Sequence, residues 1–314
     1  MSSKLVIPDA LKTDVPENKW GKVLAATPVI MTVIATLLAG LSSGEMTRAQ
    51  YDRSLAAQLQ SKAGDQWNYF QAKRLRAALQ RNTLDILHSA GGIHRLNPDT
   101  LKTYAAFLHP SAKLQSVTQE TALLTLATGQ LPDADPAGPM PPRILEARDA
   151  IDSAQADSEV AKLLSSISPA DLESSLQSAK KNVRELDAVL RPVEATIREI
   201  EVAIAVKPPG GNDPFTRDFI AARLDFAAQR YDLESRQNQV IAQLYELQVR
   251  QSNISAERHH RRSERFFYGM LVAQMGVIIS TFSLAARQRS ILWALGAAAG
   301  VSAIAFAAYV YLFV

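Results

Sequence analysis

The chain has 314 residues, of which 47% are hydrophobic and 21% are charged, and its formal net charge is +3. It contains no cysteine, which excludes disulfides, thiolate zinc sites, iron–sulfur clusters and cysteine nucleophiles. The small positive charge, without any basic-aromatic module, argues against binding to nucleic acid.

Three stretches contain no Asp, Glu, Lys, Arg or His, and each meets the length of ~20 apolar residues that a helix needs to cross a bilayer. After an N-terminal tail (1–22), they predict transmembrane helices at 23–41, 266–286 and 291–313. The first stretch is longer than the apolar core of a signal peptide and has only a weak cleavage site, so we expect an uncleaved anchor. Pro28 should kink this helix or mark its first turn.

The last two stretches are separated by four residues, which forces an antiparallel pair of helices. Gly296 and Gly300 have the GxxxG spacing that lets two helix backbones approach closely. If this motif is used, the neighbouring stretch of the pair is its expected partner. The alternative is that small residues are simply common in membrane helices.

Residues 42–128 are predicted to form a helical region. No proline interrupts the segment from Glu45 to Ser89, and an apolar stripe runs along it. Gly91-Gly92 should end this helix, and Asn97-Pro98 should begin the next, giving shorter helices over 98–108 and 111–128. The stripe consists of Leu59, Ala63, Phe70, Ala77, Leu84 and Leu87.

Residues 129–142 form a predicted proline-rich linker, because this short segment holds five of the 15 prolines. Asp133 and Asp135 lie in it, and we interpret them as solvating charges rather than a functional carboxylate pair.

Residues 143–265 are predicted to form a long antiparallel helical hairpin, with Ser168 as the cap of its first arm, a kink or restart at Pro192 and a break at 207–214. Each arm carries a heptad-like seam, so a coiled coil between chains is the second interpretation. The second arm should continue into the apolar stretch at 266. The first seam is Ala179, Val183, Leu186, Leu190, Val193, Ile197, Ile200 and Ile204, and the second is Phe219, Phe226, Leu233, Val240, Leu247 and Ile254.

A search for catalytic motifs yields no candidate. Gly40–Gly44 matches G-x-S-x-G, but a transmembrane helix precedes it where the nucleophile elbow needs a strand. The sequence has no P-loop, HExxH or glycine-rich dinucleotide turn. Adjacent His259 and His260 point in different directions on a helix, which is unsuitable for shared metal ligation. We therefore predict no catalytic residue, no metal ligand and no cofactor.

A basic cluster precedes the second apolar stretch. Arg258, Arg261, Arg262 and Arg265 are predicted to face lipid headgroups as a collar that attracts anionic lipid. A charge cluster that only sets topology is the alternative. The basic residues near the ends of the apolar stretches are nearly balanced between the two sides, and this cluster slightly favours a cytoplasmic position for residues 42–265.

The segment from Lys62 to Arg76 contains Asp65-Gln-Trp-Asn-Tyr-Phe-Gln-Ala-Lys73. It resembles the signature of an uncharacterised family of bacterial membrane proteins, domain of unknown function 4337, although Gly64 stands where the family tends to have Ser. The basic-aromatic run from Arg262 to Tyr268, followed by two apolar stretches, is also similar. The resemblance covers roughly residues 20–90 and 215–314, with 95–210 as an expected insertion. It implies a multi-pass protein of the bacterial inner membrane and brings no known activity.

Within this motif, Asp65, Tyr69 and Lys73 should line one face of a helix, with Trp67 and Gln71 on an adjacent face. We predict that these side chains pack against another helix through specific hydrogen bonds, for example from Trp67 to a carboxylate. A ligand site formed by the same residues is the alternative.

Taken together, the sequence predicts an all-α membrane protein that acts as a non-enzymatic, membrane-anchored scaffold or assembly module. Its expected partners are the lipid bilayer and either a second copy or another protein, bound through the heptad faces. An enzymatic interpretation has only the Asp65–Lys73 face to support it. The main alternative is a small oligomeric channel or transporter accessory subunit, with a polar lining of Thr32, Thr36, Gln274, Ser280, Thr281 and Ser283.

Overall fold

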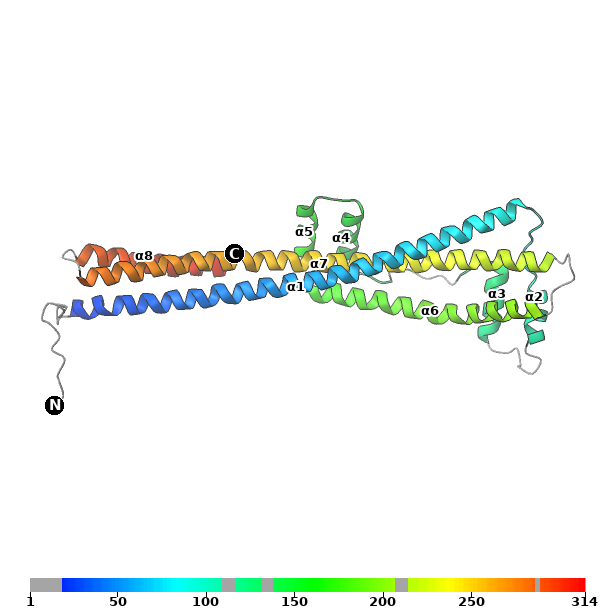
Figure 1. The fold of residues 1–314 in the computed structure, drawn as a ribbon, viewed down its shortest axis with the longest axis horizontal. Helices are drawn as coiled ribbons and strands as arrows, with labels where there is room; N and C mark the ends of the chain where they lie inside the picture. The colour runs from blue at the N-terminus through cyan, green and yellow to red at the C-terminus, as the bar shows by residue number, and fades with distance from the viewer. Residues whose placement is uncertain (1–18, 109–116, 132–137, 207–213, 286–288, 314) are drawn as a thin grey trace, which may run out of the picture. The chain divides into compact units, whose positions relative to one another are not determined.

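A computed structural model of the chain describes residues 19–108, 117–131, 138–206, 214–285 and 289–313, and all regular structure in these ranges is helical (Figure 1). The chain divides into two compact units. The first, here called the apolar unit, combines Met1–Ala56 with Ser252–Val314, and the second, the helical unit, is Ala57–Gln251. Two long helices each contribute to both units.

Helix α1 (Lys19–Ser89) contains the first apolar stretch and the Asp-Gln-Trp motif without interruption. Pro28 lies inside the helix, so the prediction that it marks the first turn is wrong. The helix ends as predicted before Gly91 and Gly92, whose φ angles of 74° and 72° are left-handed values that glycine adopts without strain. The predicted apolar stripe is the inward face, because its members are buried or half-buried.

Helices α2 (Pro98–Leu108) and α3 (Val117–Thr128) follow, and both pack on α6. The Asn97 side chain accepts a hydrogen bond from the Asp99 backbone N–H at 2.9 Å, which caps the predicted start of α2. The predicted helix over 111–128 is confirmed from Val117 onward, and its first residues lie outside the described ranges.

Two short helices, α4 (Pro142–Asp152) and α5 (Asp157–Ser165), follow the proline-rich linker and were not individually predicted. Asp133 and Asp135 of this linker lie outside the described residues. A fully buried glutamine on α7 holds α4: Arg148 Nε donates to Gln243 Oε1 at 2.9 Å, and Gln243 Nε2 donates to Asp152 Oδ1 at 2.6 Å.

Replacing Gln243 by leucine should release α4 and α5 from α7 while leaving the long helices intact. The variant removes both hydrogen bonds and leaves polar groups of α4 without this partner, which costs about 1–3 kcal/mol. Limited proteolysis should therefore cleave the segment around 153–156 at least several-fold faster. Gln239→Leu is the matched control, because Gln239 makes no side-chain hydrogen bond in the described ranges; equal cleavage of the two variants would contradict the prediction.

Helices α6 (Pro169–Val206) and α7 (Pro214–Ala285) carry the two predicted seams. Ser168 Oγ accepts a hydrogen bond from the Asp171 N–H at 3.1 Å, so the predicted cap is confirmed. The predicted restart at Pro192 is absent, because α6 continues through it. Residues of both seams share one buried cluster with side chains of α2 and α3: Leu101, Leu123, Leu126, Leu186, Leu190, Val193, Ile197, Ile200, Phe219 and Phe226.

Helix α8 (Arg289–Phe313) is, with α1 and α7, one of three helices in the described part of the chain that are long and apolar enough to cross a membrane. The predicted continuation of α7 through the arginine cluster is confirmed. In the apolar unit, Gly296 lies so close to α7 that a Cβ there would be 3.2 Å from Ser280 Cβ and 3.3 Å from Gly276 O. Gly296 therefore packs against the expected neighbour, whereas Gly300 faces the Met31 side chain of α1.

Candidate functional site

The Asp-Gln-Trp motif occupies the part of α1 that belongs to the helical unit. Trp67 and Lys73 are half-buried on the side that meets α7, whereas Asp65, Tyr69 and Gln71 are exposed. Both predicted faces are therefore divided by the helical periodicity of α1, because Lys73 is separated from Asp65 and Tyr69, and Trp67 from Gln71.

Trp67 forms the predicted hydrogen bond to a carboxylate. Its Nε1–H donates to Glu246 Oε1 of α7 at 2.7 Å. The Phe70 ring meets the Trp67 ring edge to face, with centroids 5.4 Å apart and planes at 82°. The acceptor, Glu246, was not identified from the sequence, because nothing in its local pattern distinguishes it from the other glutamates of α7.

Lys73 lies at the centre of a charged network that ties α1 to α7 and α6. Its Nζ forms an ion pair with Glu234 and lies 5.1 Å from the centroid of the Tyr231 ring. Glu234 also accepts a hydrogen bond from Arg230 Nε at 2.6 Å, and Arg230 pairs with Glu194 of α6. All these side chains are partly buried, so the pairs are better shielded from solvent than surface salt bridges.

The exposed motif residues are not drawn into this network. Within the described ranges, Asp65, Tyr69 and Gln71 make no side-chain hydrogen bond or ion pair, and Tyr69 is 57% exposed. Asp65 therefore has no neighbour that would position it as a general acid or base. No three His, Asp or Glu side chains among the residues that the structure places are arranged to hold a metal ion.

A cavity of about 550 Å³ opens beside the motif, between α1, α6 and α7. Tyr69 and Lys73 line it from the motif, so two of the five predicted residues border a space large enough for a small ligand. Its polar lining is mixed in charge: the principal charged members are Lys73, Lys180, Arg184, Asp187, Arg230 and Glu234.

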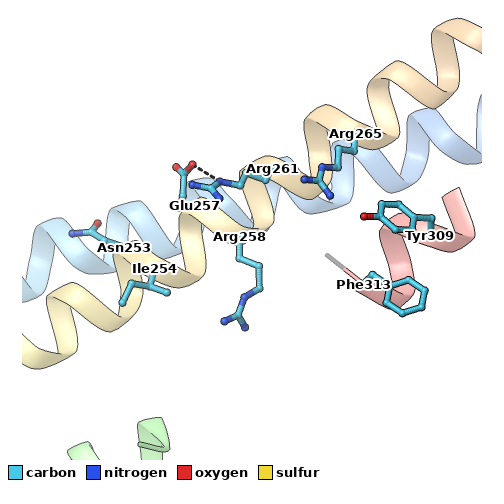
Figure 2. Close-up of a pocket in the computed structure, with 8 residues that line it drawn as sticks. All are labelled: Asn253, Ile254, Glu257, Arg258, Arg261, Arg265, Tyr309 and Phe313. Atoms are coloured by element: carbon cyan, nitrogen blue, oxygen red, sulfur yellow. Dashed lines mark hydrogen bonds and ion pairs between the residues drawn. The ribbon is translucent and has the colours of Figure 1, made fainter. Parts of the chain in front are cut away.

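The second predicted group, the arginines of α7, lies in the apolar unit. Arg258, Arg261 and Arg265 line a cavity of about 670 Å³ together with Tyr309 and Phe313 of α8 (Figure 2). The predicted fourth member, Arg262, does not line it, and its Nε is buried without a hydrogen-bond partner. Arg261 Nε donates to Glu257 Oε1 at 2.9 Å, and this hydrogen bond is the main reason that the pKa of Glu257 lies below its ordinary value.

The two histidines within this basic cluster contact acidic residues. His259 Nδ1 lies 2.5 Å from Glu45 Oε2 of α1, and His260 Nε2 lies 3.4 Å from Glu264 Oε1. One turn from His259, Ser263 Oγ donates to Ser42 O at 2.8 Å and Ser42 Oγ donates to Ser263 O at 2.9 Å, so α1 and α7 are clamped by polar contacts at this level.

The comparisons with known proteins bear on the motif. The model of the family described as Domain of unknown function (DUF4337) matches residues 20–129. This confirms the resemblance over about a third of the chain, including the Asp-Gln-Trp segment, α2 and α3. The match runs past residue 95 to Gly129 and does not include residues 215–314, for which the resemblance stays a prediction. Comparison with curated proteins finds no significant match, and comparison with solved structures finds none either.

The matched segment also contributes the first of the three apolar helices. These helices carry the threonine, serine and glutamine side chains considered for a channel lining. Each threonine or serine hydroxyl of that set donates to a carbonyl of its own helix: Thr32 to Pro28, Thr36 to Thr32, Ser280 and Thr281 to Val277, and Ser283 to Ser280. Such hydroxyls satisfy their own hydrogen-bonding needs and are compatible with lipid or helix contact. Thr32 and Thr36 of α1 and Gln274 of α7 nevertheless line one cavity of about 450 Å³, so three of the six candidate lining residues lie together.

Proposed function

We propose that this chain is a non-enzymatic, membrane-anchored helical scaffold that assembles with a second copy of itself. Its anchor is the three apolar helices, each of which crosses the membrane. Support comes from the large apolar side chains that these helices leave exposed, such as Val33, Leu37, Ile278, Phe282 and Val301, each more than half exposed. Contiguous apolar surface of this extent is unfavourable in water and favourable in hydrocarbon.

The scaffold is a long antiparallel hairpin of α6 and α7, braced by α1. The contacts between α6 and α7 run in opposite chain directions, which supports this arrangement. Glu173 of α6 contacts Gln248, Glu194 pairs with Arg230, and Glu201 pairs with Arg223. The seams predicted for these helices are therefore buried within the chain, and self-association requires another surface.

The two faces of α1 carry the proposal. One face is buried against the rest of the helical unit, and its motif residues Trp67 and Lys73 are engaged in bonds that hold helices together. The opposite face of α1 carries exposed apolar residues at heptad spacing. At ~100° of rotation per residue, these residues lie about 160–180° around the helix axis from the buried face. Leu75, Leu79 and Ile86 are 62%, 55% and 72% exposed. We call this outer seam the stripe of Ala72, Leu75, Leu79, Asn82 and Ile86.

A second copy of the chain is the occupant that fits the outer seam. Asn82 interrupts the apolar positions, and a lone asparagine in a heptad seam is best satisfied by a polar partner across the interface. An identical helix supplies such a partner together with matching apolar residues.

The position in the cell is part of the same proposal. We place the protein in the bacterial inner membrane with the helical unit in the cytoplasm, supported by the positively charged run from Arg258 to Arg265 beside the second apolar stretch. Protease added to intact spheroplasts should leave the proline-rich linker (129–142) uncut, and cleavage there would place the helical unit outside the cytoplasm.

Light scattering and chemical cross-linking of the full chain in mild detergent test self-association. Wild-type protein should be dimeric, and Leu75→Glu combined with Leu79→Glu should weaken the dimer at least tenfold, because two charges enter an apolar seam at positions where glutamate still favours helix. Val189→Glu combined with Val202→Glu is the matched control, since both valines are exposed on α6. A strict monomer at all concentrations, or selective ion flux in proteoliposomes, would refute the scaffold.

A further inference from the structure

The cavity beside the arginines of α7 has the size of a ligand site. Its volume of about 670 Å³ lies within the ~300–1,000 Å³ typical of small-molecule pockets. Figure 2 shows the side chains of Arg258 and Arg265, from α7, and the rings of Tyr309 and Phe313, from α8, around the same open space. The cavity therefore has a cationic wall and an aromatic wall.

The cationic wall carries uncompensated charge. Arg258 and Arg265 are seven residues apart and so lie on one helix face, and neither makes a hydrogen bond or ion pair within the described ranges. Arg261 is different, because Glu257 accepts its hydrogen bond. Two guanidinium groups with free donors thus border the cavity, and guanidinium groups bind phosphate oxygens with good geometry.

The aromatic wall lies at the level where the apolar part of α7 begins. Gly269 lies just after Phe266, at the start of the apolar stretch, and a Cβ on it would be 3.6 Å from Phe306 Cδ1 of α8. The following turns of α8 carry Tyr309 and Phe313, whose rings stack with centroids 5.6 Å apart. Stacked aromatic side chains beside basic residues at the end of an apolar helix are typical of the membrane–water boundary.

We propose that this cavity binds one anionic phospholipid. Arg258 and Arg265 bind its phosphate, and Tyr309 and Phe313 pack against its glycerol and the first carbons of its acyl chains. The inference deepens the proposed function, because it rests on the membrane anchor, and it replaces a diffuse basic collar by a defined site. The aromatic wall favours a lipid over free phosphate, since inorganic phosphate has no apolar part to place there.

Binding of dioctanoyl phosphatidylglycerol to the detergent-solubilised full chain, measured by native mass spectrometry, tests the site. Wild-type protein should retain one such lipid more strongly than dioctanoyl phosphatidylcholine. Arg258→Gln and Arg265→Gln should each weaken binding about tenfold, because each removes a charge-assisted pair of hydrogen bonds. Arg262→Gln, which makes the same change of charge outside the cavity, should alter binding less than twofold.

The source of the phosphate is tested by competition. Millimolar inorganic phosphate should not displace the lipid, and Tyr309→Ala should weaken lipid binding several-fold. An equal loss of lipid affinity in the Arg262 and Arg265 variants would indicate a diffuse basic collar instead of a defined site. Displacement of the lipid by phosphate, with no effect of Tyr309→Ala on binding, would indicate a site for free phosphate. Either result overturns the proposal. Alkaline extraction of membranes tests the membrane anchor separately from the lipid site. If the protein stays in the membrane but all variants bind lipid equally, the lipid site is refuted and the membrane anchor stands. If alkaline extraction releases the protein, the membrane anchor itself is refuted.

Discussion

Replacing Gly296 by leucine is expected to destabilise the packing of the three apolar helices, whereas the same change at Gly40 is expected to leave it unchanged. At Gly296, the atoms that a side chain would meet are the Gly276 carbonyl oxygen and the Ser280 backbone and Cβ, which cannot move without shifting α7. Overpacking a tight contact costs about 1–3 kcal/mol, and a leucine against backbone belongs at the upper end. At Gly40 of α1, the position that a Cβ would take has no neighbouring atom within 4 Å in the described part of the chain.

The thermal unfolding midpoint of the full chain in mild detergent, followed by circular dichroism, measures this difference. Gly300→Ala provides a graded comparison. Its only close neighbour in the described part of the chain is the end of the Met31 side chain, a flexible group that can rotate away. The expected order of stability is Gly40→Leu equal to wild type, then Gly300→Ala, then Gly296→Leu. Equal midpoints for the two leucine variants would show that the GxxxG spacing is incidental.

Features that depend on local sequence could be predicted. The apolar helices follow from length and the absence of charge, and the start of α6 follows from the Ser168 cap and Pro169. The inward stripe of α1 and the two seams follow from periodicity, because a helix that packs along its whole length must keep its apolar residues on one side. The end of α1 at Gly91 and Gly92 follows from the conformational freedom of glycine.

Features that depend on distant residues could not be predicted. The helix α4 is held by Gln243, which lies about 90 residues further along the chain and whose burial no local pattern reveals. The acceptor for Trp67 is chosen by the register between α1 and α7, so its identity requires the fold. The aromatic wall of the lipid cavity has a weak local signal, the four-residue spacing of Tyr309 and Phe313, but its position beside Arg265 depends on how α7 and α8 pack.

Trp67→Ala should destabilise the helical unit by about 2 kcal/mol, and Tyr69→Ala, on the same helix, by less than about 0.5 kcal/mol. The difference follows from their surroundings: Trp67 is half-buried, packs on Phe70 and donates to Glu246, whereas the Tyr69 side chain is mostly exposed. Urea unfolding of the full chain in detergent measures both. Trp67→Phe removes the hydrogen bond while keeping most of the ring contact. It should lower the free energy of unfolding by about 1 kcal/mol, which is part of the loss expected for Trp67→Ala.

A double-mutant cycle with Glu246→Leu then decides between a bracing role and a ligand role for the motif. If Trp67 braces α1 against α7, the Trp67→Phe and Glu246→Leu effects should be coupled by about 1 kcal/mol, because Trp67→Phe removes the donor and Glu246→Leu removes the acceptor of the same hydrogen bond. The same pair should combine additively with Gly296→Leu, since that glycine belongs to the other compact unit. If the motif instead serves to bind a ligand, Trp67→Phe should leave the stability of the ligand-free protein unchanged. The coupling between the Trp67 and Glu246 substitutions should then vanish. A measured coupling near zero would therefore remove the main physical support for a structural motif, and with it the argument that this face of α1 exists to hold a scaffold together.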